Sequence, residues 1–592
     1  MREKTLTLLE FDAIRQQVAQ SALNEEATRQ ILRESPGWDP EEVRTLKALV
    51  VALGERMTVG AEEPRTPLPD ISPVLPKLSV EGVGLAQEEA YALGVFIDRG
   101  EALRQWLLGG EAKDAAAQQA GPQLLRGLVA ALPDATALAR EVFRVLDKTG
   151  KLRDLPALRD IRARIRTLTG EREALMSRYT QNEDTRYMLQ SPVPVQRDGR
   201  TVLAVKTNFR GRIKGIVHEL SATGQTVFVE PAEVVEKNNE LLMESQRLEG
   251  EIRRILRELA IRIAAHRETL EEFHLGIIRL ETIRARARYS VETQGCFAEE
   301  DERCIVLKQA RHPLLGERAV PIDLSLPEHT KTVILTGPNT GGKTVTLKTL
   351  GLLALMNQFG LALPTAPGTR LPFCDGVYAD IGDEQSLKAS LSTFSAHMSA
   401  IAAIIARATE QSLVLLDEPG TGTDGQEGSA LAQAILDRLG ENQVRVMATT
   451  HQGALKYYGY TQEAAENASV EFDVTTWSPT YRILMGASGE SRALEIAARN
   501  GIPQAVIDRA RSYLQADRAD VSALIQGLER KHQELNRALI QAEAEGQRLE
   551  AERRALELRE LRLRQREAEL KAEGATELRR LLEESRKTLE NL

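Results

Sequence analysis

Apolar residues recur at near-helical spacing near the start of the chain. They are Leu6, Leu9, Phe11, Ile14, Val18 and Leu23. Prolines at positions 36, 40, 64, 67 and 69 mark the connections between helices. The pattern predicts an all-α core or lever domain over residues 1–150. This part contains no motif of catalytic residues, so packing and support are its expected roles.

The next 145 residues predict an arm. A charged helix is expected over 153–185, and Ser191-Pro192-Val193-Pro194 interrupts its pattern. Helical spacing returns from about 232 and runs to about 290. Two long helices around a short β structure predict an antiparallel coiled-coil clamp arm over 151–295, with a β tip at about 191–231. Strands are expected at 201–205, 213–218 and 226–230.

Short apolar strands alternate with helices in the following part of the chain. The strands are expected at 332–335, 413–416 and 444–448. This alternation predicts an α/β domain over 296–515. Residues 516–592 return to a charged helix and are expected to form a coiled-coil extension. Its predicted apolar seam comprises Leu524, Leu528, Leu535, Leu539, Leu549, Leu556 and Leu561. The fold class is therefore mixed.

Composition narrows the classes of protein to consider. A chain of 592 residues is long enough for several domains, and its net charge of -9 means that any basic surface must be local. Three scattered cysteines disfavour a zinc site or a disulfide framework and fit reduced thiols. The N-terminus lacks the apolar region of a signal peptide, and the most apolar stretch, 349–356, is too short to cross a bilayer. We therefore expect a cytoplasmic protein with no membrane partner.

A basic island lies in the expected tip of the arm. Between residues 196 and 218 the chain carries six cations against one acid, Asp198. The cations are Arg197, Arg200, Lys206, Arg210, Arg212 and Lys214. A solvated surface hairpin is the plain interpretation. The reversed sign in an acidic chain, at the end of an arm, favours contacts with the phosphates of a nucleic acid.

A glycine-rich segment joins the strand expected at 332–335 to a helix expected at 345–356. It matches the pattern G-x-x-x-x-G-K-[ST] with Gly337, Pro338, Asn339, Thr340, Gly341, Gly342, Lys343 and Thr344. In this context the backbone N–H groups and the helix N-terminus bind phosphate oxygens. Lys343 is expected to reach the β- and γ-phosphates of ATP, and Thr344 to hold Mg²⁺.

Two acids end the strand expected at 413–416. Asp417 is placed to orient Mg²⁺ and its water, and Glu418 to polarise the water that attacks ATP. A further strand over 444–449 leads to His451 one βαβ step later, which predicts the same sheet edge as the phosphate loop. A sensor of the γ-phosphate is the expected role of His451.

Four segments together resemble the MutS branch of the ABC ATPases. They are 336–344, which resembles the phosphate loop; Ser392-Thr393-Phe394, which resembles the signature; 417–424, which resembles the Walker B segment and its loop; and 449–451, which resembles the switch histidine. The resemblance is closer to the second bacterial branch of the family, MutS-II. The segments that match this branch are 8–12, 209–218, 228–231 and 380–386. Together these resemblances extend over nearly the whole chain.

The resemblance implies a homodimer in which two ATPase domains pair head to tail. Ser392 of one subunit then faces, in trans, the ATP that Lys343 of the other subunit holds. Residues 497–503 and the helix after them resemble the helix-turn-helix that supports this dimer. Val320 and Ile322 occupy the region that lies against adenine.

Two parts of related proteins are not expected here. Mismatch-repair MutS begins with a mismatch-reading domain that carries a Phe-x-Glu wedge, whereas this sequence begins in the helical core. Phe228-Val229-Glu230 has that spelling but lies in an expected strand of the arm. MutS-II proteins usually end in a Smr nuclease domain, and its L-D-x-H/R-G and H-G-x-G motifs do not occur before Leu592. Neither mismatch recognition nor endonuclease activity is expected from these residues.

The family resemblance leaves two functions open. One is an ATP-dependent dimer that binds branched or double-stranded DNA and suppresses homologous recombination. The other is a ribosome-binding ATPase that senses and splits collided ribosomes, with rRNA as the polyanion. A basic tip does not separate them, because phosphate contacts carry no sequence information. A structural ATPase of the SMC type predicts a split ATPase, and a transporter ATPase predicts L-S-G-G-Q; this sequence shows neither.

Overall fold

The computed structural model describes residues 2–58, 62–80, 82, 84–108, 120–338, 342–382, 390–473, 478–488, 494, 497–498 and 501–512, with short stretches between 545 and 587. The chain forms two compact units. The sheet unit comprises Met1–Phe11, Gly295–Asn357 and Leu363–Leu592, and the helical unit comprises Asp12–Gln294 and Gln358–Ala362. The four-part division expected from the sequence stays a prediction, and most of the extension expected at 516–592 lies outside the described residues.

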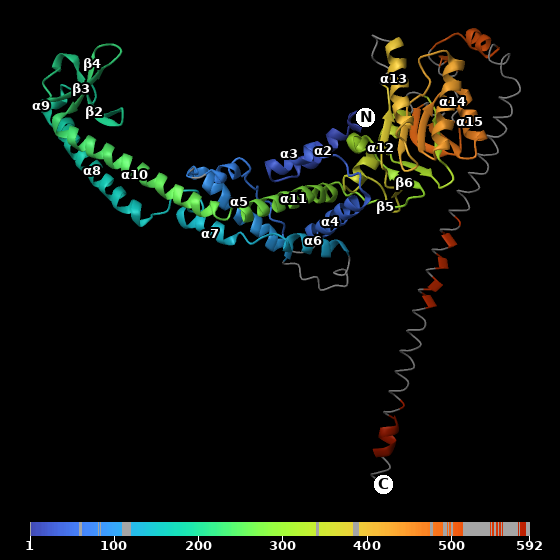
Figure 1. Ribbon diagram of the computed structural model, residues 1–592, viewed down its shortest axis with the longest axis horizontal. Helices are drawn as coiled ribbons and strands as arrows, with labels where there is room; N and C mark the ends of the chain where they lie inside the picture. The colour runs from blue at the N-terminus through green and yellow to red at the C-terminus, as the bar shows by residue number, and fades with distance from the viewer. Residues whose placement is uncertain are drawn as a thin grey trace. The chain divides into compact units, whose positions relative to one another are not determined.

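A six-stranded sheet, partly visible in orange in Figure 1, organises the sheet unit. Its strand order is β10-β11-β12-β8-β13-β14. Neighbouring strands are parallel as far as β13, and β14 pairs with β13 in the antiparallel direction. The strands are β8 (Thr332–Thr336), β10 (Val377–Asp380), β11 (Leu413–Leu416), β12 (Arg445–Thr450), β13 (Ala465–Asp473) and β14 (Ser478–Met485). The three strands expected in this region are confirmed as β8, β11 and β12.

A smaller sheet and several helices complete the sheet unit. The smaller sheet has the order β5-β9-β6-β7. Its strands are β5 (Glu299–Glu300), β6 (Ile305–Ala310), β7 (Ile322–Leu326) and β9 (Arg370–Leu371), with the 3-10 helix η4 (Pro313–Arg318) between β6 and β7. The helices are α1 (Arg2–Leu8), α12 (Lys343–Gln358), α13 (Ser390–Ile405), α14 (Gly425–Glu441) and α15 (Gly453–Thr461).

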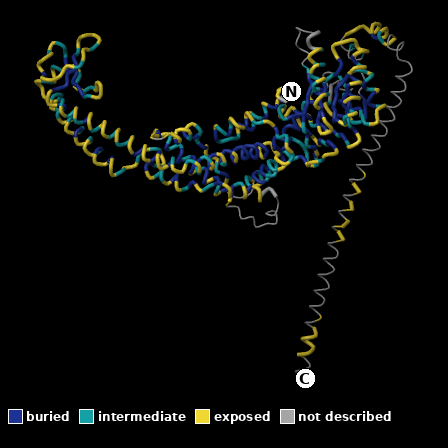
Figure 2. The backbone as a smooth tube through the Cα atoms, in the orientation of Figure 1, coloured by how far each residue is buried: buried dark blue, intermediate teal, exposed yellow. Residues whose placement is uncertain are grey.

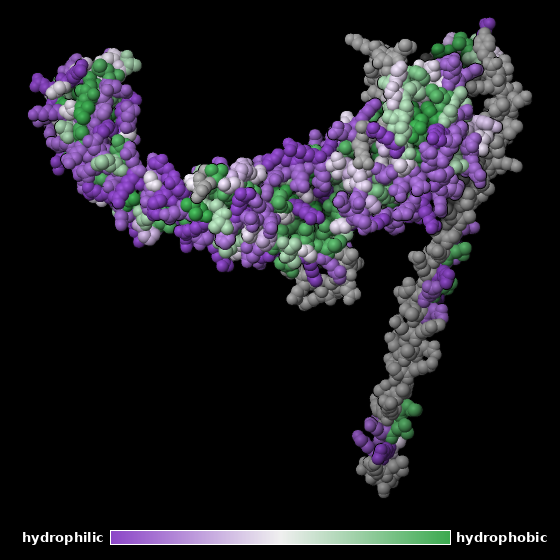
Figure 3. Space-filling view, viewed as in Figure 1, coloured by the Kyte–Doolittle hydropathy of each residue, from purple (hydrophilic) through white to green (hydrophobic). Residues whose placement is uncertain are grey.

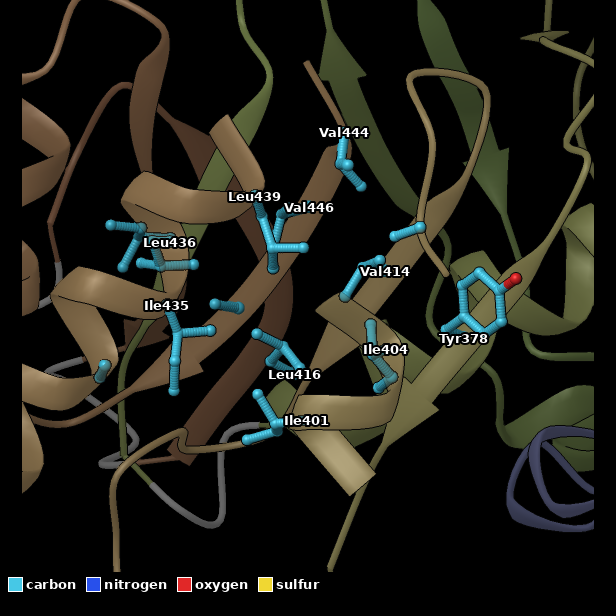
Figure 4. Close-up of a cluster of buried hydrophobic side chains, with 14 of the residues drawn as sticks. Tyr378, Ile401, Ile404, Val414, Leu416, Ile435, Leu436, Leu439, Val444 and Val446 are labelled. Atoms are coloured by element: carbon cyan, nitrogen blue, oxygen red, sulfur yellow. The ribbon is translucent and has the colours of Figure 1, made fainter. Parts of the chain in front are cut away.

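The core of the sheet unit lies between the parallel strands and the helices that cover them. Figure 4 shows side chains of β10, β11 and β12 packed against α13 and α14. Tyr378, Val414 and Leu416 point from the strands into the cluster, where they meet Ile401 and Ile404 of α13. β8, β10, β11 and β12 are buried along their whole length, as expected for a parallel sheet whose two faces are both covered. This packing holds the carboxyl ends of the strands at one edge.

The helical unit is built around α11, which carries charge into its core. The helices before the arm are α2 (Phe11–Gln20), α3 (Glu25–Arg33), α4 (Pro40–Thr58), η1 (Leu75–Ser79), α5 (Gln87–Leu108), α6 (Ala120–Ala130) and α7 (Thr136–Val145), and α11 spans Arg267–Glu292. The eleven residues 280–290 of α11 are all buried, three arginines among them, and Figure 2 shows this stretch in dark blue. None of the helices in the described part of the chain is long and apolar enough to span a bilayer.

Ion pairs compensate the buried charges of α11. Arg284 lies 2.7 Å from Glu281, and Arg286 lies 2.7 Å from Glu34. Arg286 also donates to the backbone oxygen of Phe359 at 3.0 Å, and its guanidinium carbon lies 4.2 Å from the centre of that phenyl ring. Burial raises the pKa of Glu281, whereas the arginines and the N–H of Leu23 lower it, and the pKa lies above its ordinary value. A buried charge that lost its partner would remain desolvated without compensation.

The arm consists of α8 (Pro156–Gln181) and α10 (Ala232–Ala264), which pack against each other. Arg164 contacts Glu240 at 2.6 Å, and Lys237 contacts Glu171 at 3.0 Å, so the two helices run in opposite directions. Figure 2 shows that most of their surface is exposed or half-buried. Whether the pair has the regular packing of a coiled coil stays a prediction.

A four-stranded antiparallel sheet forms the tip, in the order β1-β2-β4-β3. Its strands are β1 (Val195–Arg197), β2 (Arg200–Lys206), β3 (Gly215–Leu220) and β4 (Thr226–Pro231), and α9 (Glu183–Arg186) and η3 (Thr207–Phe209) accompany them. Three of these strands were expected from the sequence. β1 was not, because it has only three residues and none of them is buried.

One long helix was expected from 232 to about 290, and this prediction is wrong. The structure has two helices, α10 and α11, with Ala265 and His266 between them. His266 leaves helical geometry with φ -118° and ψ 28°. Neither residue at the break is Gly or Pro, so the local sequence does not reveal it. Packing decides it, because α11 buries Leu270, Phe273 and Ile277 in the helical unit.

We expect Arg286→Ala to destabilise the helical unit strongly. The substitution leaves Glu34 and the Phe359 carbonyl without their partner, so unfolding should become easier by about 3–5 kcal/mol. Arg262→Ala is the control, because Arg262 forms a 3.2 Å ion pair with Glu141 on the surface, where about 0–1 kcal/mol is typical. Urea unfolding followed by circular dichroism compares the two variants. Equal midpoints would show that the buried pair is not a major source of stability.

Candidate nucleotide site and nucleic-acid interface

The carboxyl ends of β8, β11 and β12 bring the predicted phosphate site together. Lys343 begins α12 after β8, and its Nζ lies 2.9 Å from Oε1 of Glu418, which follows β11. The amine is almost fully buried. Residues 339–341 lie outside the described part of the chain, so the predicted loop is seen from Gly337 to Pro338 and again from Gly342. The basic and acidic groups expected to act on ATP therefore lie in contact at the carboxyl edge of the sheet.

Glu418 is held between two nitrogen atoms. Oε2 lies 3.2 Å from Nδ1 of His451, and Oε1 accepts from Lys343. Burial raises the pKa of Glu418, but the contacts with Lys343 and His451 outweigh it, and the pKa lies below its ordinary value. The carboxylate therefore stays ionised at neutral pH. Its backbone has φ 49°, an unusual conformation for a residue other than glycine that is often found at functional sites.

Oxygen atoms suited to Mg²⁺ lie beside this pair. The hydroxyl of Thr344 donates to Oδ2 of Asp417 at 2.8 Å. A hydroxyl and a single carboxylate suit Mg²⁺, which binds oxygen and usually keeps several waters and substrate phosphates as ligands. No cluster of three or more His, Cys, Asp or Glu side chains with the arrangement of a metal site occurs among the described residues. The donor set fits an ion brought in with a nucleotide better than one held by protein alone.

Thr449 connects the two acids, and sequence reasoning gave it no role of its own. Its hydroxyl donates to Oδ1 of Asp417 and accepts the backbone N–H of Glu418 at 3.0 Å. The residue lies in β12, directly beside β11 in the parallel sheet. Thr449 stands near the end of β12, and β12 pairs with β11, the strand that leads to Asp417 and Glu418. A threonine at such a position is a pattern that could have revealed it.

Comparison with known proteins agrees with this geometry. Residues 333–516 match the family described as MutS domain V. The chain is 42% identical over 457 residues to the Endonuclease MutS2 of Pelotomaculum thermopropionicum. The aligned region covers 77% of this chain and 57% of that protein. The Endonuclease MutS2 proteins of Bacillus velezensis and Geobacillus thermodenitrificans are each 36% identical, over 92% and 93% of this chain and 69% and 70% of their own lengths.

The chain belongs to the MutS family, in its MutS2 branch. The family resemblance expected from the sequence is thereby confirmed, and with it a MutS-type ATPase domain. The chain spans from somewhat over half to about 70% of the length of these three relatives. The roles of individual residues are not settled by these likenesses and stay predictions.

A cavity of about 270 Å³ opens next to the phosphate site of this MutS2 chain. Val320 and Ile322, the residues expected near adenine, both line it, together with Gly342, Val345 and Tyr481. A β-carbon on Gly342 would lie 3.1 Å from Cδ1 of Tyr481, and Gly342 has φ 90°. Glycine at this position therefore allows both the turn and the approach of the phenol ring. Tyr481 was missed because β14 brings it there from outside every motif.

Three segments named from the sequence are only partly described, and two of them, Ser392 and 497–503, were expected at the dimer interface. Ser392 lies in the first turn of α13, but its side chain lies outside the described residues. Residues 383–389, which carry most of the 380–386 match, also lie outside them. Of the expected helix-turn-helix over 497–503, residues 499 and 500 are not described, whereas 501–512 are.

The six predicted tip cations fall into two groups of three. Arg200 donates to both carboxylate oxygens of the buried Glu230, at 2.8 and 3.1 Å. Arg197 lies over the ring of Phe228, and Lys206 donates to the backbone oxygen of Tyr187 at 2.9 Å. These three stabilise the tip. The other three, Arg210, Arg212 and Lys214, are exposed, and the Arg197 side chain, 45% exposed, also reaches solvent.

Glu230 is the buried centre of the tip. It also accepts from Asn238 of α10 at 2.8 Å and lies 2.6 Å from Nε2 of His218. Burial raises its pKa, the hydrogen bonds from Asn238, His218 and Arg200 lower it, and the pKa lies below its ordinary value. The network ties the tip sheet to the arm. It explains why the wedge-like spelling at 228–230 belongs to a structural strand.

The exposed cations lie beside exposed apolar residues. Ile216, Val217 and Leu220 of the edge strand β3 are 49%, 41% and 49% exposed. Figure 3 shows a hydrophobic patch on the tip between hydrophilic areas. We call Arg210, Arg212, Lys214, Ile216, Val217 and Leu220 the tip surface. Phosphate binding alone does not require the three apolar residues of the tip surface.

We expect Thr449→Val to slow Mg²⁺-dependent ATP hydrolysis by about 10- to 100-fold, the range typical of lost supporting hydrogen bonds around a metal ligand. The change keeps the shape of the side chain but removes the hydroxyl that orients Asp417 and the turn at Glu418. Thr369→Val is the control, because Thr369 is another buried, hydrogen-bonded threonine of the sheet unit. Steady-state ATPase assays over a range of Mg²⁺ concentrations measure the effect. Equal rates in the two variants would contradict the role given to Thr449.

Proposed function

We propose that this MutS-family chain is an ATP-dependent, nucleic-acid-binding homodimer. The observation that carries the proposal is the contact of the buried Lys343 with Glu418, beside the Thr344 and Asp417 oxygens. A buried lysine paired with a carboxylate can exchange that partner for the phosphates of ATP. Glu418 would then be able to polarise a water molecule, and Thr344 and Asp417 would hold Mg²⁺.

The base and the second subunit would complete the site. Val320, Ile322 and Tyr481 supply apolar and aromatic surface of the kind that an adenine ring packs against. Ser392 of the other subunit would face the γ-phosphate in trans, with the domains paired head to tail. His451, beside Glu418, would sense the γ-phosphate. ATP binding would thereby favour a closed dimer.

DNA is the first candidate for the polyanion that the arm contacts. The three exposed cations of the tip surface can each contact a phosphate in branched or double-stranded DNA. A dimer that binds branched DNA under control of ATP could suppress homologous recombination. The relatives carry the name endonuclease. We expect nuclease activity in this family to require a Smr domain, and we assign none to the residues described above.

The ribosome is the second candidate, and the apolar part of the tip surface favours it. Ile216, Val217 and Leu220 are suited to a partner that presents more than phosphates. A collided ribosome offers rRNA and protein surfaces close together. The ATPase would then drive ribosome splitting.

Glu418→Gln tests the ATPase assignment. We expect it to bind ATP and form a stable dimer, while hydrolysis falls by about 10²–10⁴-fold because the group that polarises water is lost. Lys343→Ala is the comparison and should lose ATP binding or turnover while remaining folded. Nucleotide-binding, ATPase and sedimentation-velocity measurements separate these effects. Normal turnover in Lys343→Ala, or a monomeric Glu418→Gln protein at saturating ATP, would refute the assignment.

The partner is tested by substituting the tip surface in two ways. Changing Arg210, Arg212 and Lys214 to Gln should flatten the dependence of log K on log salt for DNA by about 0.9 per lost phosphate contact, or roughly 2.7 in all. A matched control changes Arg140, Arg144 and Lys148, an exposed set of the same residue types. Ile216→Ser with Leu220→Ser should spare DNA binding but weaken cosedimentation with stalled ribosomes if the second candidate is right. An unchanged salt slope in the charge variant excludes phosphate contacts by these residues.

A further inference from the structure

A histidine and an aspartate outside the predicted motif roles meet at the edge of the main sheet. Nδ1 of His397 lies 2.9 Å from Oδ2 of Asp380. Asp380 is the buried last residue of β10, and His397 lies on α13 with about a third of its side chain exposed. The contact therefore fastens α13 to the sheet at the carboxyl end of an outer strand.

The pair lies next to the acids of the nucleotide site. The backbone oxygen of Asp380 accepts the N–H of Asp417 at 2.9 Å, so the two strand ends are joined directly. Gly382 makes room for the imidazole, because a β-carbon there would lie 2.9 Å from Cε1 of His397. The ring is thus held by a hydrogen bond on one side and by close backbone on another.

The position of His397 along α13 gives the contact its importance. The second half of the helix is fixed by Ile401 and Ile404, which are buried in the core cluster (Figure 4). Ser392 lies five residues before His397, about 7.5 Å along the helix axis. His397 is therefore the polar anchor between the buried half of the helix and the end that carries Ser392.

We propose that the His397–Asp380 pair positions Ser392 for action on the ATP of the partner subunit. His397 is a positioning residue and does not touch the nucleotide of its own subunit. The proposal rests on the head-to-tail dimer of the proposed function. A shift of about 1 Å in a catalytic group can cost about 10²-fold in rate, so loss of this anchor should slow hydrolysis markedly.

The first test separates binding from turnover in the full chain. We expect His397→Ala to bind ATP through its own Lys343 with affinity close to that of the wild type, while kcat falls by about 10²-fold. Asp380→Asn should retain much of the rate, because its amide oxygen can still accept from Nδ1. Ser399→Ala is the control on the same helix, since it removes a hydroxyl that donates to the backbone oxygen of Ser395 at 2.8 Å. A normal kcat in His397→Ala overturns the proposal.

The second test asks whether His397 acts in trans, using dimers with two different affinity tags. In a dimer of Lys343→Ala with His397→Ala, the intact phosphate site faces an intact α13, so ATPase activity should persist. In a dimer of Lys343→Ala/His397→Ala with wild type, the intact phosphate site faces the altered α13, so activity should fall. A role within one subunit predicts the opposite pattern, and that pattern overturns the proposal.

Dimer formation by the wild type is measured first, by sedimentation with ATP. A protein that remains monomeric overturns both the head-to-tail dimer and the role of His397. A wild-type dimer combined with the opposite activity pattern overturns the role of His397 alone. Activity of the dimer between Lys343→Ala and His397→Ala also shows that the altered subunit is folded.

Discussion

The parallel pairing of β10, β11, β12 and β8 is the constraint on which the nucleotide site depends. It carries four strand ends from separate parts of the chain to one edge of the sheet. Asp380, Asp417, Thr449 and Lys343 follow or end these strands, and hydrogen bonds join each of them to a neighbour. A one-residue change in the register of any strand would turn its terminal side chain to the other face. The chemistry of the site is thus a consequence of sheet register.

Charge is buried in both units, and its function differs between them. In the sheet unit, Lys343 and Glu418 pair with each other at the candidate nucleotide site. In the helical unit, Arg286 and Glu34 form part of a network within the core around α11. Burial alone therefore does not identify a functional charge. The buried Lys343 of the site directly follows Gly342, which lines a cavity, whereas the arginines of α11 are buried within the helical unit.

The tip shows how one cluster of like charges divides into two roles. Arg200 is used to hold Glu230 in the interior of the tip, and only part of the basic island reaches solvent. The exposed cations then lie beside the apolar edge strand β3. Counting cations along the chain overstates the charge available to a nucleic acid, because some cations compensate buried acids.

Sequence alone predicted the strands β8, β11 and β12 and the residues of the candidate phosphate site, because their spacing is local and each residue type has specific chemistry. Lys343, Asp417, Glu418 and His451 were all recognisable from short motifs next to apolar strands. Tyr481, the hydrogen bonds of Thr449 and the contact between Asp380 and His397 emerged only from the tertiary structure, since their importance depends on which strands become neighbours. The break at Ala265 and His266 has the same origin, because packing of α11 overrides the helical preference of the local sequence. Local chemistry can be read along the chain, whereas contacts between distant segments follow from strand register and core packing.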